Sequence, residues 1–146
     1  MIAIRPLTLS DLPNCESLYH TVFTSPPWNE SWTMDCVRRR LSDILNTPGA
    51  RGWILTESDE VRAFLLGHEE AYANQNHFYL KEMCVHPAHQ RRGLGRQLIE
   101  HFMANERQRG SAFVYLLTER DSGAQDFYTR AGFYVSPRMI QMSHRF

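Results

Sequence analysis

The sequence lacks an excess of charge of either sign. Its 146 residues include 16 basic and 16 acidic side chains, and the sequence pI is 7.1. A protein that binds nucleic acid or an anionic membrane through its overall field needs a basic surplus, which is absent here. The arginines at positions 38–40 are interpreted as a solvated helix face. The composition therefore predicts neither a nucleic-acid partner nor a membrane partner.

The sequence also lacks long apolar runs and a disulfide framework. No apolar run could span a bilayer, and the first residues show no signal-peptide pattern. The cysteines, at positions 15, 36 and 84, are odd in number and widely spaced, as is typical of reduced thiols. Repeats, linkers and low-complexity tracts are missing as well. These absences predict a cytoplasmic protein with a single domain over residues 1–146.

What is present is an alternation of strand and helix patterns that predicts an α/β (α+β) fold. The expected order is β-α-α-β-β-β-α-β-α-β-β. Strands are predicted at 1–7, 53–56, 61–68, 78–85, 112–117, 133–135 and 139–142. The strand at 112–117 is almost entirely apolar, which is typical of a buried central strand.

Residues 78–101 carry the clearest functional pattern: a strand, a glycine-containing loop and a helix. Glycines and the free N–H groups of a first helical turn form an anion site, and arginines add charge. The loop lacks the Lys-Ser or Lys-Thr pair of a P-loop and the third glycine of a dinucleotide-binding turn. A plain surface turn remains the alternative. The candidate residues are Gln90, Arg91, Arg92, Gly93, Leu94, Gly95 and Arg96.

Two motifs together resemble the GNAT superfamily of N-acetyltransferases. Gln-x-x-Gly-x-Gly, after a strand that ends in Val-x-Pro, resembles that family's acetyl-CoA pyrophosphate loop. The segment 124–133, with an Ala, then Phe-Tyr, then Gly-Phe, resembles its closing segment. The resemblance implies one domain with a central mixed, mostly antiparallel sheet flanked by helices. It also implies acetyl-CoA as co-substrate and a homodimer as one possible assembly. No metal is predicted, because His86 and His89 flank a proline in a turn and no cysteine or carboxylate completes a ligand set.

The resemblance implies further cofactor contacts. In the family the pantetheine arm pairs with the fourth strand, which implicates the main chain of Met83, Cys84 and Val85. An asparagine often contacts this arm, and here Asp121 stands in its place, which leaves that contact open. The tyrosine of the Phe-Tyr pair, Tyr128, is the implied general acid for the leaving thiolate.

Glu82 is the candidate general base. A two-residue period places it on one face with Phe78, Leu80 and Cys84, which are apolar. Burial there would raise its pKa and make it a better base near neutral pH, directly or through water. Pairing with an arginine, or a place in a wet cleft without chemistry, is the alternative. A nucleophilic role for Cys84 is less favoured than a small buried strand residue.

Trp28, Glu30 and Trp32 are the candidate acceptor-binding residues. Aromatic walls with carboxylates suit a cationic amine, although the tryptophans could instead anchor their loop to the core. This segment resembles small bacterial GNAT proteins near the aminoglycoside and other small-amine acetyltransferases. Three functions stay open: acetylation of a small-molecule amine, which is favoured; acetylation of a protein N-terminus or lysine; and non-enzymatic acyl-CoA sensing.

Overall fold

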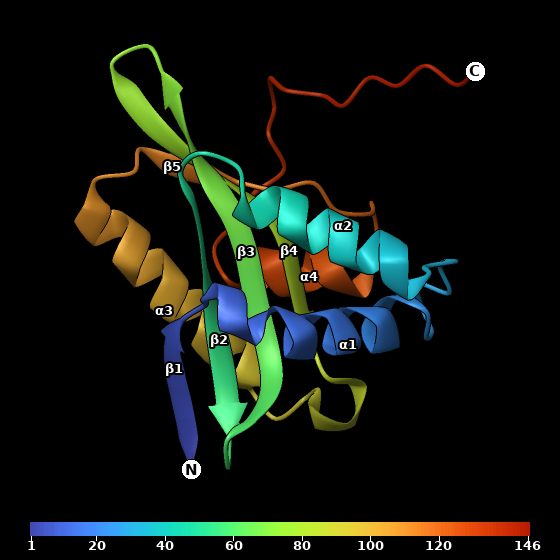
Figure 1. The fold of residues 1–146 in the computed structure, drawn as a ribbon. Helices are drawn as coiled ribbons and strands as arrows, with labels where there is room; N and C mark the ends of the chain where they lie inside the picture. The colour runs from blue at the N-terminus through green and yellow to red at the C-terminus, as the bar shows by residue number, and fades with distance from the viewer.

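A five-stranded sheet with the order β1-β2-β3-β4-β5 forms the centre of the protein in a computed structural model that describes residues 1–146 (Figure 1). The first four strands are antiparallel neighbours, and β5 runs parallel to β4, so the predicted mixed, mostly antiparallel sheet is confirmed. The strands are β1 (Ile2–Pro6), β2 (Ala50–Glu57), β3 (Glu60–Tyr72), β4 (Gln75–Val85) and β5 (Phe113–Tyr115).

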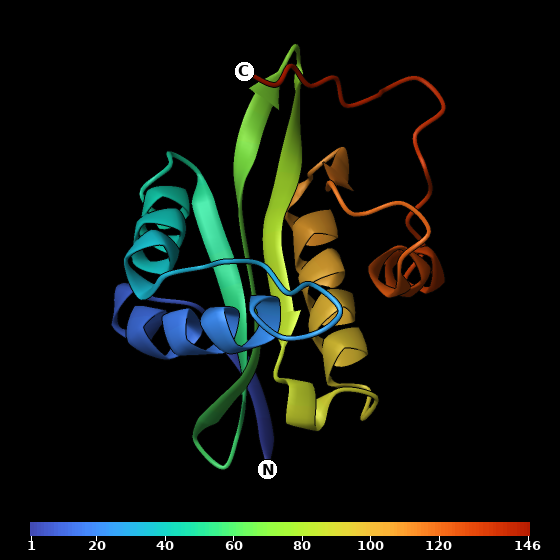
Figure 2. The same ribbon diagram turned by 90° about the vertical axis from the view of Figure 1, so that its right-hand side faces the viewer.

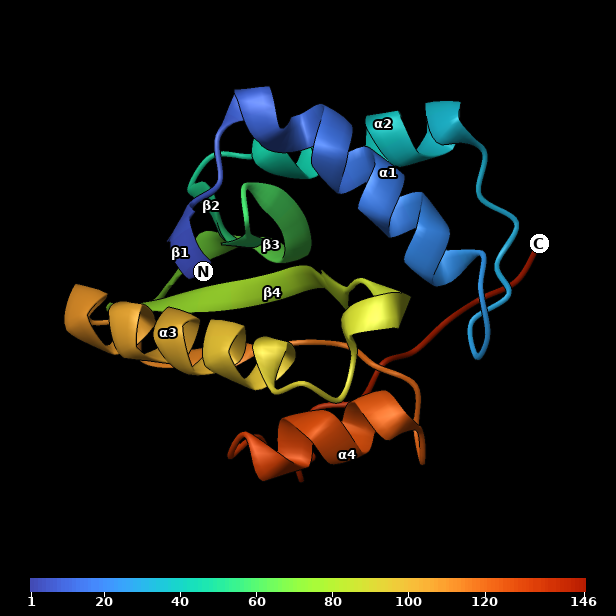
Figure 3. The same cartoon turned by 90° about the horizontal axis from the view of Figure 1, so that it is seen from below.

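Four α-helices cover the two faces of the sheet. Seen from below, α1 and α2 lie over one face, and α3 and α4 lie beneath the other (Figure 3). Each face has its own apolar core, one between the sheet and α1 and α2, the other between the sheet and α3. None of the helices is long and apolar enough to cross a membrane. They are α1 (Leu12–Phe23), α2 (Met34–Leu45), α3 (Leu94–Arg109) and α4 (Gly123–Arg130).

The helix ends follow their capping residues. Thr33 caps α2, because its hydroxyl oxygen accepts a hydrogen bond from the Cys36 N–H at 3.2 Å. The apolar stripe of α2 is buried, as its spacing predicts. Gly110 ends α3 with a φ of +84°, a left-handed conformation that glycine adopts without a steric penalty. Local sequence therefore accounts for the start of α2 and the end of α3.

A β-bulge at Lys81 divides β4 into two halves. Leu66 of β3 pairs with Glu82, but the next residue pairs with Leu80, so Lys81 has no partner. An extra residue reverses the face on which later side chains lie. Phe78 and Leu80 accordingly pack in the core next to α3, and Cys84 packs in the core next to α1 and α2. The prediction that Glu82 shares a face with Phe78 and Leu80 is wrong.

The last third of the chain also differs from the prediction. Strand β5 has three residues and lies at the edge of the sheet, with Phe113 48% exposed, rather than being a buried central strand. The two final strands predicted at 133–135 and 139–142 are absent, and residues 133–146 contain no helix or strand. Figure 2 shows this segment leaving the body of the molecule as an extended chain.

Candidate active site

A cavity of about 460 Å³ lies where β4 and β5 part. Strand β5 pairs only with residues 77–79 of β4, so residues 80–85 have no strand neighbour on that side. The walls come from the α1–α2 loop, β4, the segment after β5, α4 and the C-terminal segment. Among the predicted residues, the cavity brings together Trp28, Glu30, Glu82, Met83 and Tyr128.

Glu82 is held by two side chains from the helices on its face. Its Oε1 accepts hydrogen bonds from Arg40 Nε at 2.9 Å and from the Tyr19 hydroxyl at 3.2 Å. Burial, which leaves the side chain 9% exposed, raises the pKa of Glu82, and the two donors partly oppose that rise. No protein group hydrogen-bonds Oε2, and this atom is not sealed from solvent. Glu82 therefore has one oxygen anchored and the other available for a proton.

Arg40 and Tyr19 were not among the residues predicted for the site. Arg38 and Arg39 pair with carboxylates of the helical surface, but Arg40 reaches inward to Glu82, which corrects the view of 38–40 as a solvated face. The spacing contained the signal, because Arg40 follows Val37 by three residues and precedes Ile44 by four. Both of those residues are buried, so Arg40 lies on the inner stripe of α2.

Tyr128 lies on the opposite wall of the cavity, on α4. Its ring contacts those of Phe127 and Phe133, with centroids 5.1 and 5.5 Å away. Burial raises the pKa of the Tyr128 phenol, and the charge of Glu82 adds to the rise. The phenol is therefore neutral near neutral pH and able to donate a proton.

The predicted residues of the α1–α2 loop have two different roles. Trp28 packs on Phe23 at a centroid distance of 5.5 Å and lines the cavity together with Glu30. Trp32 lies outside the cavity wall, where its ring meets that of Tyr19 edge-on at 5.1 Å. The Trp32 Nε1–H donates to Glu30 Oε1 at 3.0 Å, so Trp32 holds Glu30 in place.

The cavity wall is acidic. Glu30, Glu82 and Glu119 contribute carboxylates, and Lys81 is the one basic side chain in the wall. A concave surface with a surplus of negative charge attracts cations. The arrangement suits a positively charged amine better than an anion.

The N-terminus of α3 has the geometry of an anion site. Arg91 and Gly93 have left-handed φ values of +64° and +78°, and Gly93 is the N-cap residue immediately before the helix. The N–H groups of Leu94, Gly95 and Arg96 have no acceptor within the chain. A Cβ on Gly95 would lie only 3.2 Å from Val85 and 3.3 Å from Phe127, so glycine allows α3 to approach β4 and α4 closely.

The side chains of this loop are less available than its backbone. Arg92 pairs with Glu57 at 2.6 Å, and Arg96 pairs with Glu100 at 2.7 Å. The Gln90 side chain donates to the Val85 carbonyl at 3.1 Å, which fixes the loop to the end of β4. Of the three predicted arginines, only Arg91 has no acidic partner.

Two further predicted residues, Cys84 and Asp121, lie outside the cavity. The Cys84 side chain is buried in the core next to α1 and α2, where burial raises the pKa of its thiol, so it does not enter the cavity. Asp121 lies outside the cavity wall and adopts a left-handed φ of +56°. No group of three or more histidine, cysteine, aspartate or glutamate side chains is arranged to hold a metal.

Comparison with known protein families identifies the family of this chain. A model of the Acetyltransferase (GNAT) family matches residues 15–133. The chain belongs to the GNAT acetyltransferase family. This membership makes it an acyltransferase, and the family uses acetyl-CoA. A comparison of this GNAT chain with curated proteins gives no match.

Solved structures share the fold at low sequence identity. An aminoglycoside acetyltransferase, meta-AAC0020 from an uncultured soil metagenomic sample, in complex with sisomicin, is 18% identical, with 99% of this chain and 96% of that chain covered and a TM-score of 0.76. Aminoglycoside N-acetyltransferase AAC(6')-Iy in complex with CoA is 18% identical, with 100% and 96% covered and a TM-score of 0.76. A possible acetyltransferase from Clostridium difficile 630 is 16% identical, with 100% and 99% covered and a TM-score of 0.84.

Proposed function

We propose that this GNAT protein is an N-acetyltransferase that moves the acetyl group of acetyl-CoA to the primary amine of a small cationic molecule. The observation that carries the proposal is the cavity itself, which has a buried carboxylate on one wall and a protonated phenol on another. Acyl transfer to an amine needs a base for the ammonium proton and an acid for the leaving thiolate. Glu82 and Tyr128 supply these two groups.

Glu82 is assigned as the general base. Burial makes its carboxylate a stronger base than an exposed glutamate, while Arg40 and Tyr19 fix its orientation through Oε1. Its Oε2 is the atom that would accept the amine proton, directly or through one water. Once the amine is neutral, its lone pair can attack the thioester carbonyl carbon.

Tyr128 is assigned as the general acid. It would give its phenol proton to the sulfur of the departing coenzyme A, because the phenol carries its proton near neutral pH and lies in the cavity with Glu82. The backbone N–H groups of Leu94, Gly95 and Arg96 would bind the pyrophosphate, and Arg91 would add a cation. The open edge of β4 at residues 80–85 would receive the pantetheine arm.

The acidic wall supports the choice of acceptor. Glu30 and Glu119 lie in the same cavity as Glu82 and would bind further ammonium groups of a polyamine-like acceptor. Trp28 offers an aromatic face to such a cation. The aminoglycosides named for two structures of this fold are cationic amines, which agrees with the proposal.

The test is a panel assay of free thiol release from acetyl-CoA. The panel contains aminoglycosides, linear polyamines, neutral amines, and peptides with free N-termini or lysines. Thiol release with cationic small amines supports the proposal. Turnover with peptides alone would contradict it and would indicate an enzyme that acetylates proteins. Tight acetyl-CoA binding without release on any acceptor would favour an acyl-CoA sensor.

A further inference from the structure

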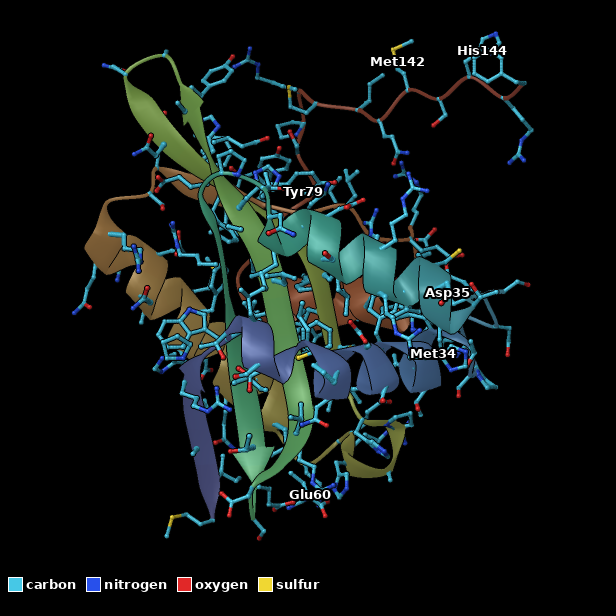
Figure 4. All side chains as sticks on the ribbon, viewed as in Figure 1. Met34, Asp35, Glu60, Tyr79, Met142 and His144 are labelled. Atoms are coloured by element: carbon cyan, nitrogen blue, oxygen red, sulfur yellow. The ribbon has the colours of Figure 1, made fainter.

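The β2–β3 hairpin lies next to the anion loop, residues 86–93 between β4 and α3, at one end of the sheet. Figure 4 labels Glu60 on this hairpin at the lower end of β3, and Figures 1 and 2 show the chain after β4 at the same end. The His86 N–H donates a hydrogen bond to the Arg62 carbonyl at 2.7 Å, which joins the two segments. The hairpin turn is tight, because residues 58–59 both have left-handed φ values, +52° and +65°. A side chain on this hairpin therefore contacts the loop from a fixed position.

The anion loop has a backbone conformation that its surroundings must hold. Arg91 has a left-handed φ of +64°, which is unfavourable for a residue with a Cβ. Such a conformation persists only where neighbouring contacts fix it. Gln90 provides one attachment before Arg91, to the Val85 carbonyl at 3.1 Å. Arg92 provides the attachment that follows Arg91.

Arg92 is bound by Glu57, the last residue of β2. Its guanidinium donates to both carboxylate oxygens, to Oε1 at 2.6 Å and to Oε2 at 3.0 Å. This is the bidentate geometry of strong arginine–carboxylate pairs. The same guanidinium donates to His89 Nδ1 at 2.8 Å, so it also joins the two halves of the loop. One guanidinium thus connects the anion loop to the hairpin.

Glu57 makes its hydrogen bonds with Arg92 alone. Arg62 Nε and His89 Nδ1 lie 3.6 and 4.0 Å from Oε2, beyond hydrogen-bonding distance. Arg62 pairs more closely with Glu60, at 2.7 Å. Hydrogen bonds from Arg92 lower the pKa of Glu57 from 4.5 to about 2, so the carboxylate is charged near neutral pH. The Glu57 carboxylate therefore acts on the anion loop.

We infer that Glu57 is the positioning residue of the pyrophosphate site, because it holds Arg92, and with it the anion loop, in the shape that receives the cofactor. The inference rests on the proposed function, in which the N–H groups of Leu94, Gly95 and Arg96 bind the pyrophosphate. A loop that is ordered before binding loses less entropy when the ligand arrives. Glu57 thus acts on cofactor binding and not on acetyl transfer. The opposite arrangement, in which Arg92 leaves Glu57 to bind a phosphate itself, predicts tighter binding once the carboxylate is removed.

The first measurement is the affinity for acetyl-CoA, by calorimetry, of the wild type, Glu57→Gln and Glu60→Gln. Glutamine keeps the size of glutamate and removes its charge. Glu60 lies on the same hairpin but pairs with Arg62 and not with the loop, so Glu60→Gln controls for the loss of a negative charge near an anionic cofactor. Glu57→Gln should bind acetyl-CoA about fivefold more weakly than Glu60→Gln. Equal affinities of the two variants, or tighter binding by Glu57→Gln, would overturn the inference.

A double variant shows whether Glu57 acts through Arg92. Arg92→Gln alone should weaken binding about as much as Glu57→Gln, and the double variant should bind no more weakly than either single variant. In steady-state assays the loss should appear in KM for acetyl-CoA, while kcat and KM for the acceptor stay within about twofold. Additive losses in the double variant, or a fall in kcat at unchanged KM, would contradict a positioning role.

Hydrogen exchange tests the order of the loop without any chemistry. In the protein without cofactor, the backbone amides of the anion loop should exchange faster in Glu57→Gln than in the wild type or in Glu60→Gln. Unchanged exchange in Glu57→Gln would overturn the inference. This readout needs no acetyl transfer, so a failure of the proposed function and a failure of the Glu57 assignment give different results.

Discussion

Replacing Arg40 with methionine tests the chemistry of Glu82 most selectively. Methionine retains much of the arginine stem but removes the charge next to Glu82. Two unit charges about 4 Å apart interact by about 4 kcal/mol at an effective dielectric constant of about 20. The Arg40 side chain is 41% exposed, so water screens the pair, and about 1–2 kcal/mol is a realistic loss. A loss of about 1.4 kcal/mol changes a protonation equilibrium tenfold.

The sign of the effect follows from the pKa of Glu82. Burial already raises this pKa, and the positive charge of Arg40 opposes the rise. Without Arg40 the pKa rises further, so the carboxylate becomes protonated at a higher pH and stops acting as a base there. The acidic limb of the turnover profile therefore moves to higher pH, and turnover on that limb falls about tenfold while the plateau changes little.

The assay is the pH dependence of turnover for the wild type, Arg40→Met and Arg39→Met. Arg39 lies on the same helix, its side chain is 85% exposed and it pairs with Asp43 at 3.8 Å, which makes it the matched control. Arg39→Met should follow the wild-type curve at every pH. Superimposed curves for Arg40→Met and the wild type, or a shift of the limb to lower pH, would refute the reasoning.

Three further changes test separate parts of the structure. Glu82→Gln should lower turnover about 100-fold near neutral pH. The effect should be smaller near about pH 10, where amines lose their protons without a base. An equal effect at every pH would contradict the assignment of Glu82 as general base. Tyr128→Phe should lower turnover tenfold or more in thiol-release assays while calorimetry shows acetyl-CoA affinity within about twofold, and Tyr134→Phe is the exposed control. Hydrogen bonds from Arg5 lower the pKa of Asp11 from 3.8 to about 2, so this carboxylate stabilises the fold above about pH 4 and loses that effect as the pH falls to about 2. Asp11→Asn should cost about 1–2 kcal/mol in urea unfolding at pH 7, with Arg5 half-exposed, and clearly less at pH 2, where about half of the folded protein has lost the carboxylate. An equal cost at both pH values would exclude the ion pair.

Local patterns in the sequence predict much of the fold. The Thr33 cap, the apolar stripe of α2 and the glycine after α3 each act within one or two helical turns, so local sequence is enough to mark these helices. The anion loop is also local, because its glycines and the helix start are adjacent in the chain. Patterns of this range need no knowledge of distant partners.

Features that depend on distant pairing could not be predicted in the same way. The bulge at Lys81 arises from the register between β3 and β4, and a strict two-residue period cannot reveal an extra residue. The apolar stretch around β5 suggests a central strand, but its burial depends on whether another strand pairs with it. The ion pair between Arg40 and Glu82 joins residues 42 positions apart, so the spacing on α2 could at most place Arg40 on the inner face and could not identify its partner.

The most direct test of the account follows the acetyl group itself. Acetyl-CoA labelled with carbon-13 in the acetyl group is mixed with the protein and its best acceptor amine. The masses of the products and of the protein are measured by mass spectrometry during the first turnover. Direct transfer in the Glu82–Tyr128 cavity predicts one labelled acetylamine for each free thiol and no label on the protein. Label that appears first on the protein, at Cys84 or elsewhere, or thiol release without acetylamine, would contradict direct transfer.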